Sequence, residues 1–234
     1  MSSDEAHAGA QHFCDLVRPG LSLGRREKLL VAGCGLGHEA LHIRHDLDLD
    51  VTGVDISTQW GSDYGSGVSN FALLEESLLE LPFPDNTFDL VFYHHVIEHV
   101  DDPATSLDEL RRVLTPGGLI YIGTPNRHRA VGYIGSQGVT TRQKIEWNWQ
   151  DYKARLRNRF RNEDGAHAGF TEVELSNLLK GRFTDIHFLT EDYLRFKYGE
   201  RLNHRLLDLV CKRPILEIAA PSVYVVARKP SSDH

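Results

Sequence analysis

The sequence predicts an α/β fold with a Rossmann-like, seven-stranded, mostly parallel sheet and helices on both faces. Short apolar runs alternate with helical segments along the 234 residues, the pattern of strand–helix units. The first apolar run, residues 29–32, breaks into three glycines, Gly33, Gly35 and Gly37. A second apolar run at 51–54 ends in Asp55. The glycine turn and this carboxylate should therefore share the edge where ligands bind in such sheets.

The remaining elements follow from local signals. The strands are expected at residues 29–33, 51–56, 70–76, 88–94, 118–124, 184–190 and 222–228. Residues 5–17 should form a leading helix. A second helix should begin at Asp101-Asp102-Pro103 and run to Leu114, because a carboxylate cap and a first-turn proline start it and residues 115–118 (Thr-Pro-Gly-Gly) stop it. Thr171 and Glu174 predict a capping box for a helix over 174–180.

Three segments depart from this regular alternation. Residues 57–67 are rich in glycine and serine, which predicts a loop carrying Trp60 and Tyr64. Residues 127–170 form an insert long enough to be functional or disordered. A second insert, about residues 192–221, holds an amphipathic leucine run suited to a helix lying on the core. That run consists of Leu202, Leu206, Leu207, Leu209 and Val210.

Length, charge and composition limit which kinds of protein this chain can be. The length suits one domain, with a core at about residues 26–126 and 171–230. A net charge of −7 argues against broad nucleic-acid binding. Because no apolar run is long enough for a membrane span and residues 1–5 lack a basic start, we expect a cytoplasmic protein with no membrane partner. Three widely spaced cysteines, Cys14, Cys34 and Cys211, suit reduced thiols.

The glycine spacing excludes two nucleotide-binding loops. A dinucleotide-binding loop needs its third glycine at position 38, which is His38. A P-loop needs Gly-Lys-Ser/Thr, which does not follow these glycines. A tight turn without a ligand is the alternative for the three glycines. The motifs that follow along the chain favour binding.

Four motifs follow the glycine turn in order. They occupy residues 81–91 (LPFPDNTFDLV), 96–103 (VIEHVDDP), 107–118 (LDELRRVLTPGG) and 124–127 (TPNR). Together with the glycine turn, they resemble the class I S-adenosylmethionine-dependent methyltransferases, most of all the branch that modifies small molecules. The resemblance covers residues 26–126. It implies S-adenosylmethionine as cofactor, methyl transfer as activity, and an acceptor-covering cap in the insert at 127–170.

The resemblance also assigns the cofactor site. The glycine turn would line the amino-acid and ribose part, and Asp55 would bind the ribose. Members of the family usually carry an aspartate where this chain has Ser77, so the Ser77 hydroxyl and the Leu78 backbone N–H are expected to hold the adenine. The predicted cofactor-binding residues are Gly33, Cys34, Gly35, Gly37, Asp55, Ile56, Ser77, Leu78, Tyr93 and His94.

The end of the fourth strand carries the candidate catalytic residues, His94 and His95. Methyl transfer from a sulfonium is an in-line displacement that needs alignment and, for some acceptors, removal of a proton. His94 is the preferred general base because histidine titrates near neutral pH. A structural role, with either histidine bonded to backbone or to the cofactor carboxylate, stays open.

The predicted substrate residues are Arg127, Trp60, Tyr64 and His167. Arg127, His128 and Arg129 follow the fifth strand directly, which makes them candidates for an anionic acceptor group. Five basic residues at alternating positions, Lys153, Arg155, Arg157, Arg159 and Arg161, suggest either an RNA-binding stretch or the solvated side of a helix. We favour the helix, and with it a small-molecule acceptor.

Two rival functions and a metal site are weighed against this interpretation. An RNA methyltransferase would use the basic insert, and a non-catalytic cofactor-binding protein would keep only the glycine turn and Asp55. His95, Glu98 and His99 match the H-x-x-E-H pattern of inverted zinc proteases. That pattern needs one continuous helix, whereas this segment follows a strand. We therefore expect no metal site. The acceptor and the oligomeric state stay open.

Overall fold

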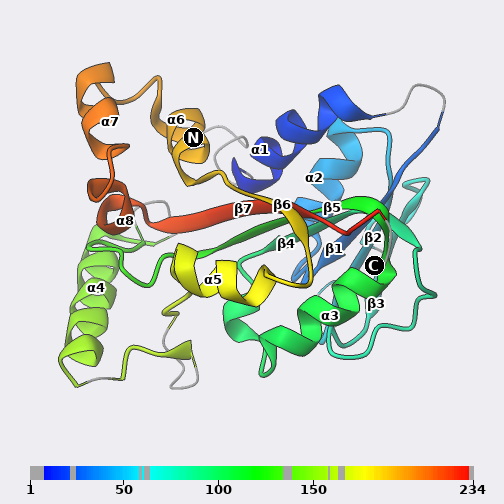
Figure 1. Cartoon of the computed structure of the whole chain (residues 1–234), viewed down its shortest axis with the longest axis horizontal. Coiled ribbons are helices and arrows are strands. Elements are labelled where there is room, and N and C mark those ends of the chain that lie inside the picture. Colours follow the sequence, from blue (N-terminus) through cyan, green and yellow to red (C-terminus); the bar gives the residue numbers. More distant parts are fainter. Residues whose placement is uncertain are drawn as a thin grey trace.

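The computed structural model describes residues 8–21, 25–57, 60, 64–133, 139–157, 159–162 and 167–231. Its seven strands form one sheet in the order β3-β2-β1-β4-β5-β7-β6 (Figure 1). The strands are β1 (Lys28–Ala32), β2 (Asp50–Asp55), β3 (Phe71–Glu75), β4 (Phe88–His94), β5 (Leu114–Pro125), β6 (Thr184–Phe188) and β7 (Ser222–Arg228). β1 to β5 pair in parallel, and β7 runs antiparallel to both β5 and β6. The predicted fold class and all seven strands are confirmed.

β5 begins earlier than predicted. It starts at Leu114 rather than at residue 118. The Thr-Pro-Gly-Gly stretch stops the preceding helix as expected, but its backbone is extended and paired. The N–H of Gly117 donates to the carbonyl of Lys229 at 3.0 Å, and the N–H of Lys229 donates to the carbonyl of Gly118 at 2.9 Å. This pairing with the chain beyond β7 lengthens the strand.

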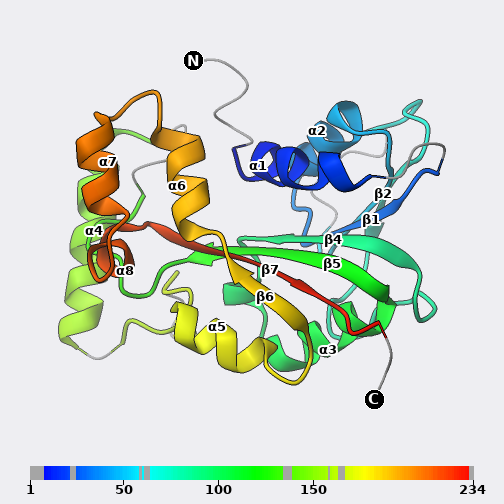
Figure 2. The same cartoon turned by 45° about the horizontal axis from the view of Figure 1, so that its top comes forward.

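Helices cover both faces of the sheet (Figure 2). α1 (Ala8–Val17), α2 (His38–Asp46) and α6 (Thr190–Tyr198) lie on one face, where they bury Phe13, Ile43 and Tyr193 against it. α3 (Pro103–Val113) and α5 (Glu172–Leu179) lie on the other, with Leu107, Leu110, Leu175 and Leu179 in its core. Short 3₁₀ turns, η2 (Arg18–Gly20) and η3 (Ile97–His99), join these layers. The apolar core therefore lies on both sides of the strands.

The predicted caps form. The Asp102 carboxylate accepts the N–H groups of Ala104 and Thr105, both at 3.1 Å, at the start of α3. Thr171 and Glu174 make the reciprocal hydrogen bonds of a capping box, although α5 begins at Glu172, two residues before the predicted start. Residues 5–7 of the predicted leading helix lie outside the described part of the chain.

The two inserts are helical and lie together at one end of the sheet in Figures 1 and 2. The first contains α4 (Thr141–Leu156), and the second contains α7 (His204–Val210) and α8 (Ile215–Ala219). The predicted leucine run lies on the core by one side only: Leu207 is buried and Val210 packs against a core cluster, whereas Leu202, Leu206 and Leu209 are exposed. The helix is short and packs near a small satellite cluster that includes Leu194 and Leu216.

The segment after β2 has no helix among its described residues, as predicted. Tyr64 to Gly67 form a turn, while residues 58, 59 and 61–63 lie outside the described part. Among the described helices, none combines the length and apolar character needed to cross a membrane.

Candidate functional site

The glycine turn after β1 is bonded to the end of β2. The N–H groups of Gly33 and Cys34 both donate to the carbonyl of Val54, at 2.8 and 2.9 Å. Gly35 N–H donates to Asp55 Oδ2 at 2.8 Å, and Ser57 N–H donates to Asp55 Oδ1 at 3.2 Å. The structure thus brings the predicted glycines and the predicted carboxylate together and fixes the orientation of Asp55.

Gly35 presents open backbone at this edge. It has a φ of +52°, in the left-handed region, and a Cβ added to it would meet nothing within 4 Å. At Gly33, by contrast, an added Cβ would lie 2.4 Å from the Val96 side chain. Gly33 is therefore required by internal packing. The space beside Gly35 is free for close approach of a ligand.

An apolar side chain stands exposed beside Asp55. Ile56 is 75% exposed, an unusual position for an isoleucine at the end of a central strand. Near the end of β3, the Ser77 hydroxyl accepts the N–H of Leu79 at 3.2 Å, while the Leu78 side chain is buried. Ile56 thus offers a surface that a flat ring can cover, and Ser77 keeps its hydroxyl proton for donation.

Two predicted cofactor residues have side chains that point into the core. Tyr93 is fully buried, and its hydroxyl lies 3.1 Å from Ser106 Oγ. Burial raises the pKa of Tyr93. The Cys34 thiol is also buried, and this burial, helped by the nearby Asp55 charge, raises its pKa to about 12. Any contact of these residues with a ligand is therefore made by their backbone, and Cys34 stays a neutral thiol.

His94 ends β4 and is held from one side. Its Nδ1 lies 3.1 Å from Glu39 Oε1, a pairing that the sequence did not indicate. Its Nε2 is buried with no hydrogen-bond partner among the described residues. A Cβ added to Gly9 of α1 would lie 2.5 Å from this Nε2, so α1 packs on the ring. Nε2 is consequently the nitrogen left for a ligand.

His95 and Glu98 form a second polar group beside β5. His95 has a φ of +55°, and its Nδ1 lies 3.5 Å from the buried carboxylate of Glu98. Burial, together with the neighbouring His94, lowers the pKa of His95. Burial alone would raise the pKa of Glu98, but hydrogen bonds from His95 and from Thr124 hold it below its ordinary value. Glu98 is a buried anion that the sequence signalled only as part of a turn.

The H-x-x-E-H segment is not one helix. His95 precedes η3, a 3₁₀ turn that spans only Ile97–His99. Across the described ranges of the chain, no three histidine, cysteine, aspartate or glutamate side chains are grouped as metal ligands.

His167 lies beside this polar group. Its ring centroid is 4.8 Å from that of His99. Burial, and then the nearby His99, lower the pKa of His167. The structure therefore places this insert residue beside η3, the turn that follows β4. Its role as a substrate residue stays a prediction.

The arginines predicted to bind an anionic acceptor group form hydrogen bonds with other residues of the protein. The Arg127 guanidinium donates to the carbonyl of Gly169 at 2.8 Å and also pairs with Glu174. Arg129 is buried, and it donates to Asp151 and to the carbonyl of His167, both at 2.9 Å. Arg129 is thus not placed to meet an acceptor, which corrects its candidacy. A substrate role for Arg127 stays a prediction.

Of the two aromatic candidates, Tyr64 lies beside the end of the glycine turn. The Tyr64 hydroxyl lies 2.8 Å from His38 Nδ1, and a Cβ on Gly37 would meet the Tyr64 ring at 2.8 Å. Trp60 is partly buried against the core cluster on the α1 and α2 face. Tyr64 therefore supports the cofactor turn directly.

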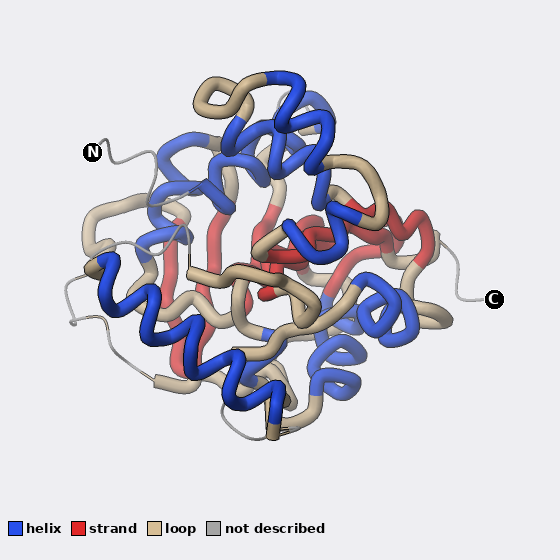
Figure 3. The backbone as a smooth tube through the Cα atoms, turned by 90° about the vertical axis from the view of Figure 1, so that its left-hand side faces the viewer, coloured by secondary structure: helices blue, strands red, loops and turns tan. Residues whose placement is uncertain are grey.

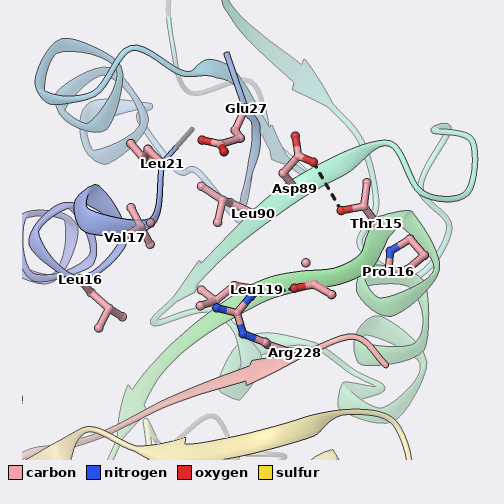
Figure 4. Close-up of a pocket in the computed structure, with 13 residues that line it drawn as sticks. Leu16, Val17, Leu21, Glu27, Asp89, Leu90, Thr115, Pro116, Leu119 and Arg228 are labelled. Carbon is pink, nitrogen blue, oxygen red and sulfur yellow. Dashed lines mark hydrogen bonds between the residues drawn. The ribbon is translucent and has the colours of Figure 1, made fainter. Parts of the chain in front are cut away.

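A cavity of about 300 Å³ opens at the opposite edge, where the parallel strands begin. Figure 4 shows Glu27, Asp89, Thr115 and Arg228 around it, with Thr115 donating to Asp89. Glu27 directly precedes β1, and the other three residues come from the starts of β4 and β5 and the end of β7. The cavity contains none of the predicted site residues, so it is separate from the candidate site.

Comparison with known proteins shows which proteins this chain resembles. Residues 30–122 match a family model described as a methyltransferase domain. The O-methyltransferase rstn1 of Aspergillus nomiae is 34% identical over 110 residues, which cover 44% of this chain and 48% of the fungal protein. Ajmaline N-methyltransferase of Rauvolfia serpentina is 33% identical over 101 residues, which cover 40% of this chain and 34% of the plant protein. The match spans less than half the length of these relatives.

Among solved structures, phosphoethanolamine N-methyltransferase 2 of Haemonchus contortus shares the fold. It was solved in complex with phosphomonomethylethanolamine and S-adenosylhomocysteine, and it superposes with a TM-score of 0.60 at 20% identity. The superposition covers 94% of this chain and 52% of that chain. At this identity the likeness bears on the fold alone.

Proposed function

Residues 30–122 match a methyltransferase domain, and from this match we propose that the protein is a class I S-adenosylmethionine-dependent methyltransferase that transfers a methyl group to an oxygen or nitrogen of a small molecule. The observation that carries the proposal is the hydrogen bond from Gly35 N–H to Asp55 Oδ2. It assembles the two parts of a cofactor site at the edge of the sheet where the parallel strands end.

The residues at this edge fit the cofactor. The oxygens of Asp55 keep lone pairs for ribose hydroxyls beside their bonds to Gly35 and Ser57. The space beside Gly35 admits a ligand close to the backbone, and the exposed side chain of Ile56 suits an adenine ring. The cofactor supplies an electrophilic methyl group on a positively charged sulfur.

We assign His94 as the general base that accepts the proton of the methyl acceptor. With Nδ1 against Glu39, the imidazole is oriented and Nε2 accepts the proton that leaves the acceptor oxygen or nitrogen as its bond to the methyl carbon forms. Because Gly9 lies on Nε2, an acceptor reaches this atom only when the start of α1 shifts. His95 stays the second candidate, and the buried anion Glu98 orients it in the same way.

A small-molecule acceptor is favoured over RNA. The basic residues of the first insert belong largely to α4 and its end, and Arg155 there is folded back onto the ring of Phe160, at 4.0 Å. The chain as a whole has a net charge of −7. If RNA were the acceptor, affinity would fall steeply with salt and with the change Arg155→Gln/Arg157→Gln/Arg159→Gln. We expect no such salt-sensitive binding in a filter-binding assay at physiological salt, and finding it would favour the RNA alternative.

Calorimetry with S-adenosylhomocysteine tests the proposed function. The wild type should bind it and should not bind NAD. Asp55→Ala should weaken binding by about 1–3 kcal/mol, because the ribose hydroxyls lose their acceptor. Asp48→Ala, which removes an exposed carboxylate paired with Arg26, is the matched control and should bind as the wild type does. Absence of binding by the wild type, or equal binding of NAD, would overturn the proposal.

A further inference from the structure

α4 carries a continuous apolar stripe that the fold leaves uncovered. Ile145, Trp149, Tyr152 and Leu156 are spaced four, three and four residues apart, so they lie on one side of the helix. They are 66%, 61%, 43% and 87% exposed. With the left-hand side of Figure 1 turned toward the viewer, α4 crosses the front of the molecule (Figure 3). The stripe is therefore an outward apolar surface on a projecting helix.

The opposite side of α4 already attaches the helix to the protein. Asn148 accepts the N–H of Gly132 at 2.7 Å, and Asp151 pairs with the buried Arg129. The Trp147 ring packs edge-on against Tyr133, with centroids 5.1 Å apart. The helix is thus held by one side. At the edge of the stripe, the Tyr152 hydroxyl also donates to the carbonyl of Ala130. The outward apolar surface is therefore made by Ile145, Trp149 and Leu156.

Positive charge is concentrated around the stripe. Residues 141–161 hold seven Lys or Arg and two Asp or Glu, in a chain whose net charge is −7. One of the two acidic residues, Asp151, is paired with Arg129. Arg142 and Lys153 flank the stripe on its exposed side, and Arg157, Arg159 and Arg161 continue the charge beyond the helix, all five being exposed. The apolar surface is therefore bordered by cations.

We propose that α4 binds an anionic lipid bilayer surface, with Ile145, Trp149 and Leu156 entering the interface and the basic residues contacting lipid headgroups. Exposed aromatic and aliphatic side chains with Lys or Arg beside them are a pattern of interfacial binding. RNA would satisfy the cations but leave these apolar side chains in water. A second copy would bring two positively charged helices together. This attachment is independent of the proposed methyl transfer.

Vesicle co-sedimentation tests the proposal on the full chain. The wild type should bind vesicles of phosphatidylcholine mixed with phosphatidylserine, should bind pure phosphatidylcholine weakly, and should be released by salt. Ile145→Ser/Trp149→Ser should lower the partition coefficient about tenfold or more, because the apolar surface is lost. Val173→Ser, at an equally exposed apolar position on α5 (69%), is the matched control and should bind as the wild type does.

Charge is tested separately. Arg159→Gln/Arg161→Gln should lower the partition coefficient about fivefold for each charge removed. Lys28→Gln/Lys180→Gln removes two exposed charges elsewhere and should change it little. Equal binding to both kinds of vesicle, no loss in the Ile145→Ser/Trp149→Ser variant, or a monomer–dimer equilibrium abolished by that variant in place of vesicle binding would each overturn the proposal. Circular dichroism of each variant checks that it is folded.

Discussion

At the scale of single residues, the site rests on backbone that only glycine adopts without strain. Gly35 and Gly181 both have positive φ, +52° and +82°, and a Cβ added to either meets nothing within 4 Å. Gly35→Ala and Gly181→Ala should therefore lower the free energy of unfolding by a similar amount, about 1 kcal/mol, in urea titrations. Only Gly35 lies beside Asp55, so only Gly35→Ala should weaken S-adenosylhomocysteine binding in calorimetry. Equal binding losses in both variants would assign the effect to stability.

The pairing of His94 with Glu39 gives a second prediction at this scale. His94→Gln should lower turnover by about 10²–10⁴-fold, because the proton acceptor is removed, while the affinity for S-adenosylhomocysteine stays close to that of the wild type. Glu39→Gln should lower turnover less, since the imidazole remains. His45→Gln, an exposed position at the end of α2, serves as the control. A His94→Gln protein with full turnover, or one that no longer binds S-adenosylhomocysteine, would contradict the assignment.

At the scale of elements, the strands and two of the helices were predictable, because apolar runs indicate buried strands and capping residues indicate helix starts. The capping box at Thr171 and the proline after Asp102 located two helices. The contacts of the inserts were not predictable. Arg129 follows β5, where ligand-binding residues are expected, yet it is buried and donates hydrogen bonds to Asp151 and to the carbonyl of His167. These partners lie 22 and 38 residues away in the sequence. Such pairings depend on the tertiary fold.

Arg129 therefore supports a prediction about the first insert. Arg129→Gln should lower the free energy of unfolding by about 3–5 kcal/mol, because Asp151 and the backbone carbonyls lose a buried cation. Urea unfolding measures the change, with Arg205→Gln, at an exposed position on α7, as the control. Limited proteolysis within residues 127–170 should become faster in Arg129→Gln. A loss no larger than that of the control would show that the pair contributes little.

At the scale of the whole molecule, three histidines whose pKa values the fold lowers make stability depend on pH; of these, His12 is buried. The pKa values of His12, His95 and His167 are lowered, in each case first by burial. Below about pH 6.5, the ordinary histidine pKa, the unfolded chain binds more protons than the folded one. Stability should therefore be full above that pH and fall as the pH falls. His12→Gln, which removes the ring 2.9 Å from the Tyr121 hydroxyl, should flatten this dependence in urea titrations. An unchanged slope would exclude His12 as a contributor.

The candidate site was predictable where local sequence determines it. The glycine turn and Asp55 were found from their spacing, and the structure joins them by a hydrogen bond. Glu39 and the buried state of Glu98 had no sequence signal, because a carboxylate in the first turn of a helix or after a strand is ordinary. The inward side chains of Tyr93 and Cys34 depend on strand register and packing.

The proposed cofactor site lies where β1 and β2 end, and a crystal structure of the protein with S-adenosylhomocysteine tests this placement. We expect the ligand beside Gly35, with its ribose on the Asp55 carboxylate and its adenine against Ile56. Ligand density in the cavity lined by Asp89, Thr115 and Arg228 at the opposite edge of the sheet, with none beside Asp55, would contradict the account.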